Sequence, residues 1–168
     1  KNVGNLIKDV KPSIMTAVPR LLDKIYVKMH DNIKTAPLLK RFIAGLAFSE
    51  ADNKNLDSTT ILTPIFNKLV YSKLLEALGG NIRFVISGGA PLSMKVERFF
   101  TNIGLVIYQG YGLTETSPVI CANSPVSKKP FTCGKAFAFA DVKIAQDGEL
   151  FTKGPYLMRG YHKQIEKT

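Results

Sequence analysis

Residues 82–118 decide the fold, and they read IRFVISGGAPLSMKVERFFTNIGLVIYQGYGLTETSP. The apolar run at 82–86 predicts a buried strand, and the small residues at 87–91 predict a tight turn directly after it. Residues 93–102 have helical spacing, and a second apolar run at 105–108 predicts the next strand. Two strands joined by one short helical crossover form a parallel, right-handed βαβ unit. We therefore expect an α/β fold with a partly parallel sheet flanked by helices.

Both ends of the crossover helix carry sequence signals. Ser93 is a residue type that favours the N-cap, where its hydroxyl accepts a backbone hydrogen bond. Gly104 is typical of the residue that follows a helix C-terminus. We expect the helix to lie between these two positions.

Upstream of this unit the pattern is mainly helical. An apolar run at 14–18 predicts one short strand. Helices are expected to begin at Pro19, near Pro37 and at Ile61, and the third to end at Gly79-Gly80. The polar run 51–60 between the second and third helices predicts a surface loop.

Downstream the character changes to short antiparallel strands. Asp147-Gly148 lies between the apolar runs 142–145 and 149–152, which is a strong hairpin signal. We divide the chain into a mainly helical part, a βαβ part and a short-strand part within one fragment, 1–168; their bounds are 1–80, 81–118 and 119–168.

Composition excludes several classes of protein. The chain has 168 residues, of which 45% are hydrophobic and 21% charged, as in a globular domain. Its longest apolar runs are far shorter than the roughly 20 residues of a membrane-spanning helix. The first residues contain neither an initiator Met nor a signal sequence, so we expect an excised piece of a longer chain. Cys121 and Cys133 lack the spacing of a zinc or redox motif, which favours a reducing, cytoplasmic setting.

The net charge of +10 does not by itself identify a binding partner. Residues 1–80 carry 12 basic and 7 acidic side chains, and residues 81–168 carry 11 and 6. Because the excess is spread evenly, a basic module for nucleic acid or anionic lipid is the weaker hypothesis, and no nucleic-acid motif supports it. Peripheral contact with a membrane stays open as an alternative.

Two glycine-containing turns hold the residues that we expect to bind a ligand. They are Ser87-Gly88-Gly89-Ala90-Pro91 and Gln109-Gly110-Tyr111-Gly112-Leu113-Thr114-Glu115-Thr116. In an open parallel sheet, ligands bind beyond the carboxyl ends of the strands, where both turns are expected to lie. Glycine allows close approach of a backbone, a threonine hydroxyl can donate to a phosphate, and a carboxylate can hold magnesium. The residues therefore predict a site for a nucleotide and its metal ion.

These motifs resemble the adenylate-forming enzymes of the AMP-binding superfamily. The similarity covers nearly the whole chain and is carried by an eight-residue signature with flanking motifs: Tyr111 to Pro118, Gly88 to Leu92, Gly148-Glu149-Leu150, Lys153-Gly154-Pro155 and Gly160-Tyr161. Within the superfamily, segments such as Val18-Pro19-Arg20 most resemble those of long-chain fatty-acid–CoA ligases. The chain then resembles a central fragment of their large N-terminal domain.

The resemblance implies a two-step reaction. A long-chain fatty acid attacks ATP to give an acyl-adenylate and pyrophosphate, and the thiol of coenzyme A then displaces AMP. It assigns catalytic roles to Thr114, which bonds the α-phosphate, and Glu115, which binds magnesium. The other residues would bind the nucleotide: Gly88, Gly89, Ala90, Pro91, Gln109, Gly110, Tyr111 and Gly112.

The family's phosphate loop, its ribose-binding Asp and its catalytic Lys have no counterpart in residues 1–168. We therefore expect the parent to be an acid–thiol ligase and the fragment alone to be inactive. Two alternatives stay open: another adenylate-forming enzyme, such as a medium-chain or aryl-CoA ligase or a peptide-synthetase adenylation domain, and the basic binding module.

Overall fold

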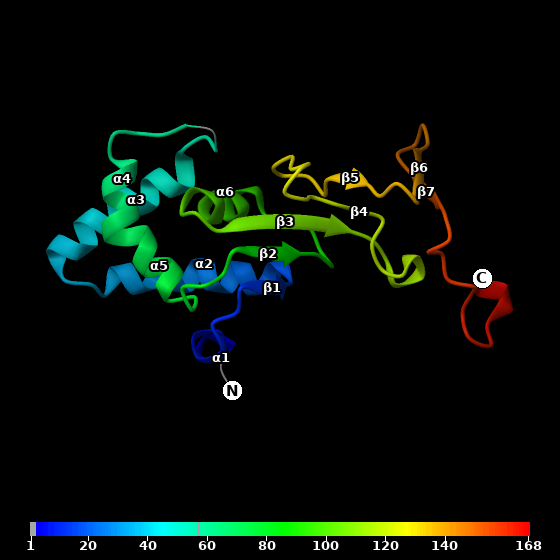
Figure 1. The fold of residues 1–168 in the computed structure, drawn as a ribbon, viewed down its shortest axis with the longest axis horizontal. Coiled ribbons are helices and arrows are strands. Elements are labelled where there is room, and N and C mark those ends of the chain that lie inside the picture. The colour runs from blue at the N-terminus through cyan, green and yellow to red at the C-terminus, as the bar shows by residue number, and fades with distance from the viewer. Residues whose placement is uncertain (1–2, 57) are drawn as a thin grey trace. The chain divides into compact units, whose positions relative to one another are not determined.

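The computed structural model describes residues 3–56 and 58–168, so Asp57 in the predicted 51–60 loop lies outside the described residues. The expected α/β fold is confirmed: a five-stranded sheet with strand order β1-β2-β3-β4-β5 has helices beside it (Figure 1). The chain separates into two compact units that divide between Ile107 and Tyr108. Each unit is described by itself.

The first unit contains the strands predicted at 14–18 and 82–86, the predicted helices and one helix, α1, that was not predicted. Its elements are α1 (Val3–Val10), β1 (Ile14–Ala17), α2 (Pro19–Lys34), α3 (Leu38–Asn53), α4 (Thr63–Phe66), the π-helix η1 (Asn67–Tyr71), α5 (Ser72–Glu76), β2 (Phe84–Ser87) and α6 (Met94–Asn102). Strands β1 and β2 pair in parallel, with Ile14 opposite Phe84 and Ala17 opposite Ser87. The predicted parallel character of the sheet is present in this pair.

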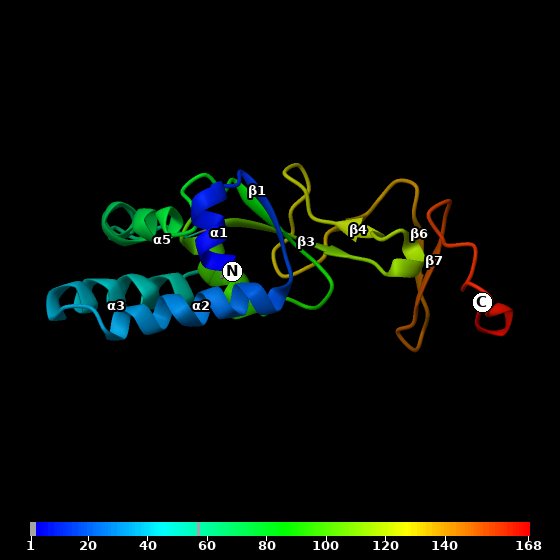
Figure 2. The same ribbon diagram turned by 90° about the horizontal axis from the view of Figure 1, so that it is seen from below.

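A core between the strands and the helices holds the first unit together. Leu22 of α2, Val85 of β2 and Phe99 of α6 are completely buried. Helices α2 and α3 lie side by side, and both contact α6 (Figure 2). Phe99 makes edge or tilted ring contacts with Tyr26 and Phe48, whose centroids lie 5.0 and 5.1 Å away. These aromatic contacts connect all three helices.

The predicted loop at 51–60 is wrong at its start, because α3 continues to Asn53 and Ala51 is completely buried. The side-chain amide of Asn102, from α6, donates hydrogen bonds of 2.9 Å to the carbonyl oxygens of Ala51 and Lys54. Carbonyl groups at a helix C-terminus have no partner within the helix. A side chain 51 positions away satisfies them here, so the polar run can stay helical.

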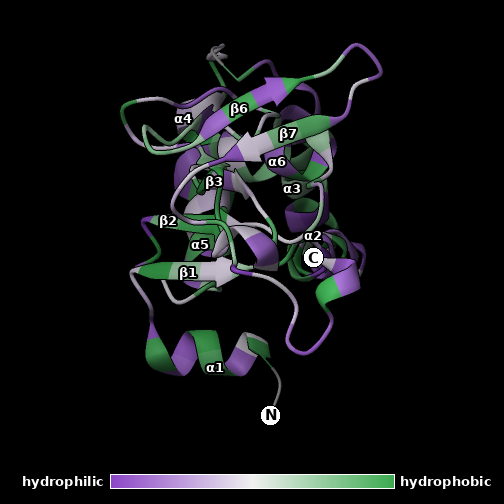
Figure 3. Ribbon diagram, turned by 90° about the vertical axis from the view of Figure 1, so that its right-hand side faces the viewer, coloured by the Kyte–Doolittle hydropathy of each residue, from purple (hydrophilic) through white to green (hydrophobic). Residues whose placement is uncertain are grey.

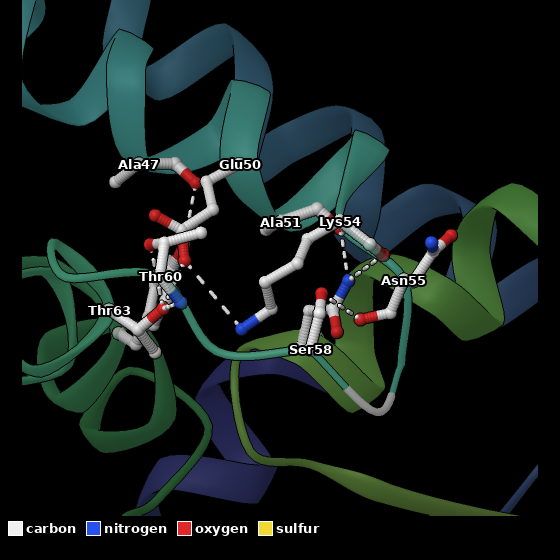
Figure 4. Close-up of polar contacts among 10 residues, drawn as sticks. Ala47, Glu50, Ala51, Lys54, Asn55, Ser58, Thr60 and Thr63 are labelled. Atoms are coloured by element: carbon white, nitrogen blue, oxygen red, sulfur yellow. Dashed lines mark hydrogen bonds and ion pairs between the residues drawn. The ribbon is translucent and has the colours of Figure 1, made fainter.

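A buried polar cluster links the end of α3 to the start of α4 (Figure 4). Glu50 Oε1 lies 3.6 Å from Lys54 Nζ, and the two side chains are only 10% and 8% exposed. The Thr63 hydroxyl donates to the same carboxylate oxygen, and the Thr60 backbone N–H donates to the Thr63 hydroxyl oxygen at 3.0 Å. A buried carboxylate requires such a cation and such hydrogen bonds.

The third predicted helix, 61–78, is present as three consecutive pieces, α4, η1 and α5. The middle piece is a π-turn, a feature that periodicity does not reveal. The segment ends as expected: Gly79 and Gly80 have φ of +96° and +76°, and the Gly80 N–H donates to Leu75 O at 3.0 Å. Ser93 lies at the N-cap of α6, but its side chain makes no capping hydrogen bond.

Tyr71 anchors η1 to α3, and its removal is expected to cost stability. The Tyr71 ring is 1% exposed, and its hydroxyl donates a 2.6 Å hydrogen bond to the carbonyl oxygen of Ala47. Tyr71→Phe keeps the ring but loses this bond, so the free energy of unfolding should fall by about 1 kcal/mol. Urea unfolding checks this. An unchanged midpoint would show that the bond contributes nothing.

The second unit consists of short strands and turns. Strand β3 (Val106–Tyr111) begins in the first unit and ends in the second. The other elements of the second unit are the 3-10 helix η2 (Thr114–Thr116), β4 (Cys121–Ala122), β5 (Lys135–Ala136), β6 (Asp141–Ile144), β7 (Leu150–Lys153) and the 3-10 helix η3 (Ile165–Lys167). The predicted hairpin is confirmed: β6 and β7 are antiparallel, with Ile144 opposite Leu150. Its strands mix polar and apolar residues (Figure 3). The pairs β3–β4 and β4–β5 are also antiparallel.

Candidate functional site

The first predicted turn follows β2 directly. Gly89 has φ of +83°, and a Cβ built there would meet no atom within 4 Å. Glycine is therefore required at this position for its backbone conformation and not for space. Gly88 is half-buried, and Ala90 and Pro91 are exposed. The tip of the turn is thus accessible.

Ser87 was predicted to begin this turn and was given no role of its own, whereas the structure places it at the end of β2. Its side chain is 2% exposed, and within the described residues its hydroxyl has no hydrogen-bond partner. A buried hydroxyl without a partner is costly, and such groups often mark a site that a ligand completes. The only sequence signal was its place beside Gly88-Gly89.

The second predicted turn begins on β3. Side chains on this strand alternate, and Gln109 is buried whereas Tyr111 is 37% exposed. Gly110 pairs with Ala122, and Tyr111 with Cys121, so the strand end is fixed by β4. The Tyr111 ring is available for stacking on a flat ligand, and Gln109 lies within the sheet.

Gly112 permits the sharp turn that follows. A Cβ at this position would clash with the carbonyl oxygen of Pro118 and would stand 2.7 Å from Val119 Cα. These are backbone atoms, which cannot move aside as a side-chain end can. The segment after β3 therefore folds back on itself only because residue 112 has no side chain.

Thr116 closes this turn from inside. Thr116 is only 2% exposed. Its hydroxyl donates a hydrogen bond to Leu113 O at 2.9 Å and accepts one from Leu113 N–H at 2.8 Å. Ser117, the next residue, has a left-handed φ of +49°, which is uncommon outside glycine. The backbone of the turn is thus held in one conformation from Leu113 to Ser117, and Thr114 and Glu115 lie within it on the short helix η2.

The Glu115 carboxylate is held by a residue 46 positions away. The Tyr161 hydroxyl donates to Glu115 Oε1 at 2.6 Å, and the backbone N–H of Met158 donates to Glu115 O at 2.8 Å. The hydrogen bond from Tyr161 lowers the pKa of Glu115, and the same bond raises the pKa of Tyr161. Glu115 is therefore ionised at neutral pH, with the neutral tyrosine as its donor. Tyr161 belonged to a quoted flanking motif, but its partner was not predictable.

Removing the Tyr161 hydroxyl should change the pH dependence of any activity that needs ionised Glu115. Tyr161→Phe lets the pKa of Glu115 rise, because the bond that favours the charged form is gone. The acidic limb of the pH–rate profile should therefore move to higher pH. Tyr156→Phe is the matched control, since Tyr156 donates to Lys153 O and not to Glu115. Superimposable profiles for Tyr161→Phe and the parent would exclude this coupling.

The structure gathers one part of the predicted site within each unit. Gln109, Gly110, Tyr111, Gly112, Thr114 and Glu115 lie on one strand end and its turn in the second unit. Gly88, Gly89, Ala90 and Pro91 lie in the first unit. Among residues 3–56 and 58–168, no three His, Cys, Asp or Glu side chains form a metal-binding group. Each helix of these same residues is too short or too polar to span a lipid bilayer.

The end of β3, the glycine turn and the Thr114–Glu115 pair thus follow one another in the second unit, and comparison with known proteins identifies the family. Residues 2–162 match the model of the AMP-binding enzyme family, and the chain belongs to this family. Its curated relatives include the long-chain-fatty-acid–CoA ligase FadD15 of Mycobacterium bovis, which is 34% identical over the whole chain. Long chain acyl-CoA synthetase 4 of Arabidopsis thaliana is 33% identical over 96% of the chain. The chain spans 29% and 27% of the lengths of these two proteins.

Solved structures show the same fold. A long-chain-fatty-acid–CoA ligase from Archaeoglobus fulgidus, FadD1, aligns over 98% of this chain and 29% of its own, with a TM-score of 0.57 and 18% identity. O-succinylbenzoate coenzyme A synthetase from Bacillus subtilis, in complex with ATP and magnesium, aligns over 96% of this chain and 27% of its own, with a TM-score of 0.52 and 19% identity. The predicted fold family is therefore confirmed.

Proposed function

We propose that this chain forms the nucleotide-binding turns of an ATP-dependent long-chain fatty acid–CoA ligase. The observation that carries the proposal is the turn at 111–118, where Gly112 and Thr116 fix the backbone that carries Thr114 and Glu115 on η2. Relatives at 33–34% identity that bear this activity in their names support the long-chain class over aryl or peptide-synthetase activities. Because the chain spans under a third of those relatives, the activity is proposed for the full-length protein.

The residues present fit a nucleotide with its magnesium ion. Magnesium is usually held by one or two carboxylates together with substrate phosphates, so the single carboxylate of Glu115 suffices. The hydrogen bond from Tyr161 favours the ionised form of this carboxylate. When bound, the ion would neutralise negative charge on the phosphates.

Each residue has a distinct task in adenylation. The Tyr111 ring stacks on the adenine, and the backbone at Gly88, Gly89 and Ala90 borders the adenine and the acyl carboxylate. The Thr114 hydroxyl donates to the α-phosphate, where charge develops as the fatty carboxylate attacks. Pyrophosphate leaves, and the thiol of coenzyme A then displaces AMP from the acyl-adenylate. Fixed donors and a cation, and not an acid–base pair, are what this chemistry requires.

Loss of the Thr114 hydroxyl tests its assignment. A hydrogen bond to a charged group is worth about 1.5–3 kcal/mol, so Thr114→Ala should slow adenylation by roughly one to two orders of magnitude. The rate is measured as ATP–pyrophosphate exchange with palmitate in the full-length protein. Thr35→Ala is the control, because the Thr35 hydroxyl lies in the first unit, at the C-cap of α2, and donates a hydrogen bond to Asn32 O of that helix. Equal rates for the two variants would remove Thr114 from the phosphate site.

A further inference from the structure

The first unit contains an apolar cavity that the adenylation turns do not use. The cavity is about 330 Å³ in volume and lies between the ends of α2 and α3 on one side and η1 and α5 on the other. None of its lining residues belongs to 87–91 or 109–116. They are Ile33, Lys40, Ile43, Ala44, Phe48, Leu69, Val70, Lys73 and Leu74.

The wall of this cavity is built from the unit's own core. Phe48 is 4% exposed, and Ile33, Val70 and Leu74 pack against the core cluster. One side is formed by the π-helix η1, which contributes Leu69 and Val70. π-Turns within helices occur frequently at functional sites. The cavity thus has a fixed apolar wall and a volume in the range of small-molecule sites.

Its polar lining is entirely cationic. Lys40 of α3 and Lys73 of α5 are exposed residues at the cavity, and no acidic residue lines it. Helix α3 carries Lys40 and Arg41 and no acidic residue before Glu50. Such a lining favours an apolar ligand whose end carries negative charge.

We propose that this cavity binds a single-chain anionic amphiphile, a long-chain carboxylate, as a second ligand site. The hydrocarbon chain lies along Ile43, Ala44 and Phe48, and the carboxylate is held between the ammonium groups of Lys40 and Lys73. This proposal does not depend on the adenylation site.

Photolabelling of the full-length protein locates the ligand. The probe is hexadecanoic acid with a diazirine in its chain, and digestion followed by mass spectrometry identifies the labelled residues. We expect label on residues 43–48 and 69–74, with competition by unlabelled palmitate. Lys40→Glu with Lys73→Glu should reduce this labelling about tenfold, because two charge-assisted contacts become repulsive.

Three control experiments test whether the labelling is specific to this cavity. Arg41→Glu with Lys68→Glu makes the same charge change on α3 and η1 at residues outside the lining, and should leave labelling unchanged. Ala44→Trp fills the cavity and should abolish it. The proposal is overturned if neither segment is labelled, if Ala44→Trp labels like the parent, or if a hexadecanol probe labels as strongly as the acid. Label elsewhere alone, with normal pyrophosphate exchange, would overturn this site and leave the ligase function intact.

Discussion

Gly112→Ala in the full-length protein should lower the rate of ATP–pyrophosphate exchange by about two orders of magnitude. The added Cβ meets the carbonyl oxygen of Pro118 and Val119 Cα, so the backbone of the turn must open. Overpacking of this kind costs about 1–3 kcal/mol, and a displacement of catalytic groups by about 1 Å can reduce a rate about 100-fold. The loss should appear mainly in the rate and less in the amount of folded protein.

Gly45→Ala is the matched control for this substitution. Gly45 lies within α3, and a Cβ there would meet no atom within 4 Å. Alanine is the better helix former by about 0.5–1 kcal/mol, so this variant should be slightly more stable and fully active. If Gly112→Ala retained the parent's exchange rate, the turn geometry would not be what places Thr114 and Glu115.

Glu115→Ala should be more damaging than Thr114→Ala, with a loss of about two to three orders of magnitude in adenylation. It removes a carboxylate from the magnesium site, and a bound cation is worth several kcal/mol of charge stabilisation. The magnesium concentration that gives half-maximal rate should therefore rise as well. Glu115→Gln keeps the size and one oxygen ligand but loses the charge, so its rate should lie between those of the parent and of Glu115→Ala. An unchanged magnesium dependence would leave Glu115 with a structural role only.

The sequence was most informative where apolar runs are bounded by glycine. Residues 84–87 form the predicted strand β2, and Gly104, with φ of +97°, ends the crossover helix as expected. Asp147-Gly148 likewise located the β6–β7 hairpin. At these places the local pattern and the final contacts favour the same structure, so short-range reasoning is sufficient.

Elements that depend on distant partners were not predictable. The end of α3 is set by Asn102, which lies 48 positions from Lys54. The π-turn η1 has no distinctive short-range pattern. Helix α1 is a different case, because Val3, Leu6, Ile7 and Val10 do have helical spacing, and this signal was not used. Within the candidate site, the glycine turns and the Thr–Glu pair were visible as motifs. The tyrosine that orients Glu115 and the unpartnered hydroxyl of Ser87 required three-dimensional coordinates.

Separate measurement of the two half-reactions in Glu115→Ala tests the central claim most directly. Acyl-adenylate formation is followed from ATP, magnesium and palmitate, and thiolysis is started from supplied acyl-adenylate and coenzyme A. The account predicts that the loss falls on adenylation and that thiolysis is affected far less, because pyrophosphate has left before the second step. Equal losses in both half-reactions would contradict the assignment of the 111–118 turn to the phosphates of ATP.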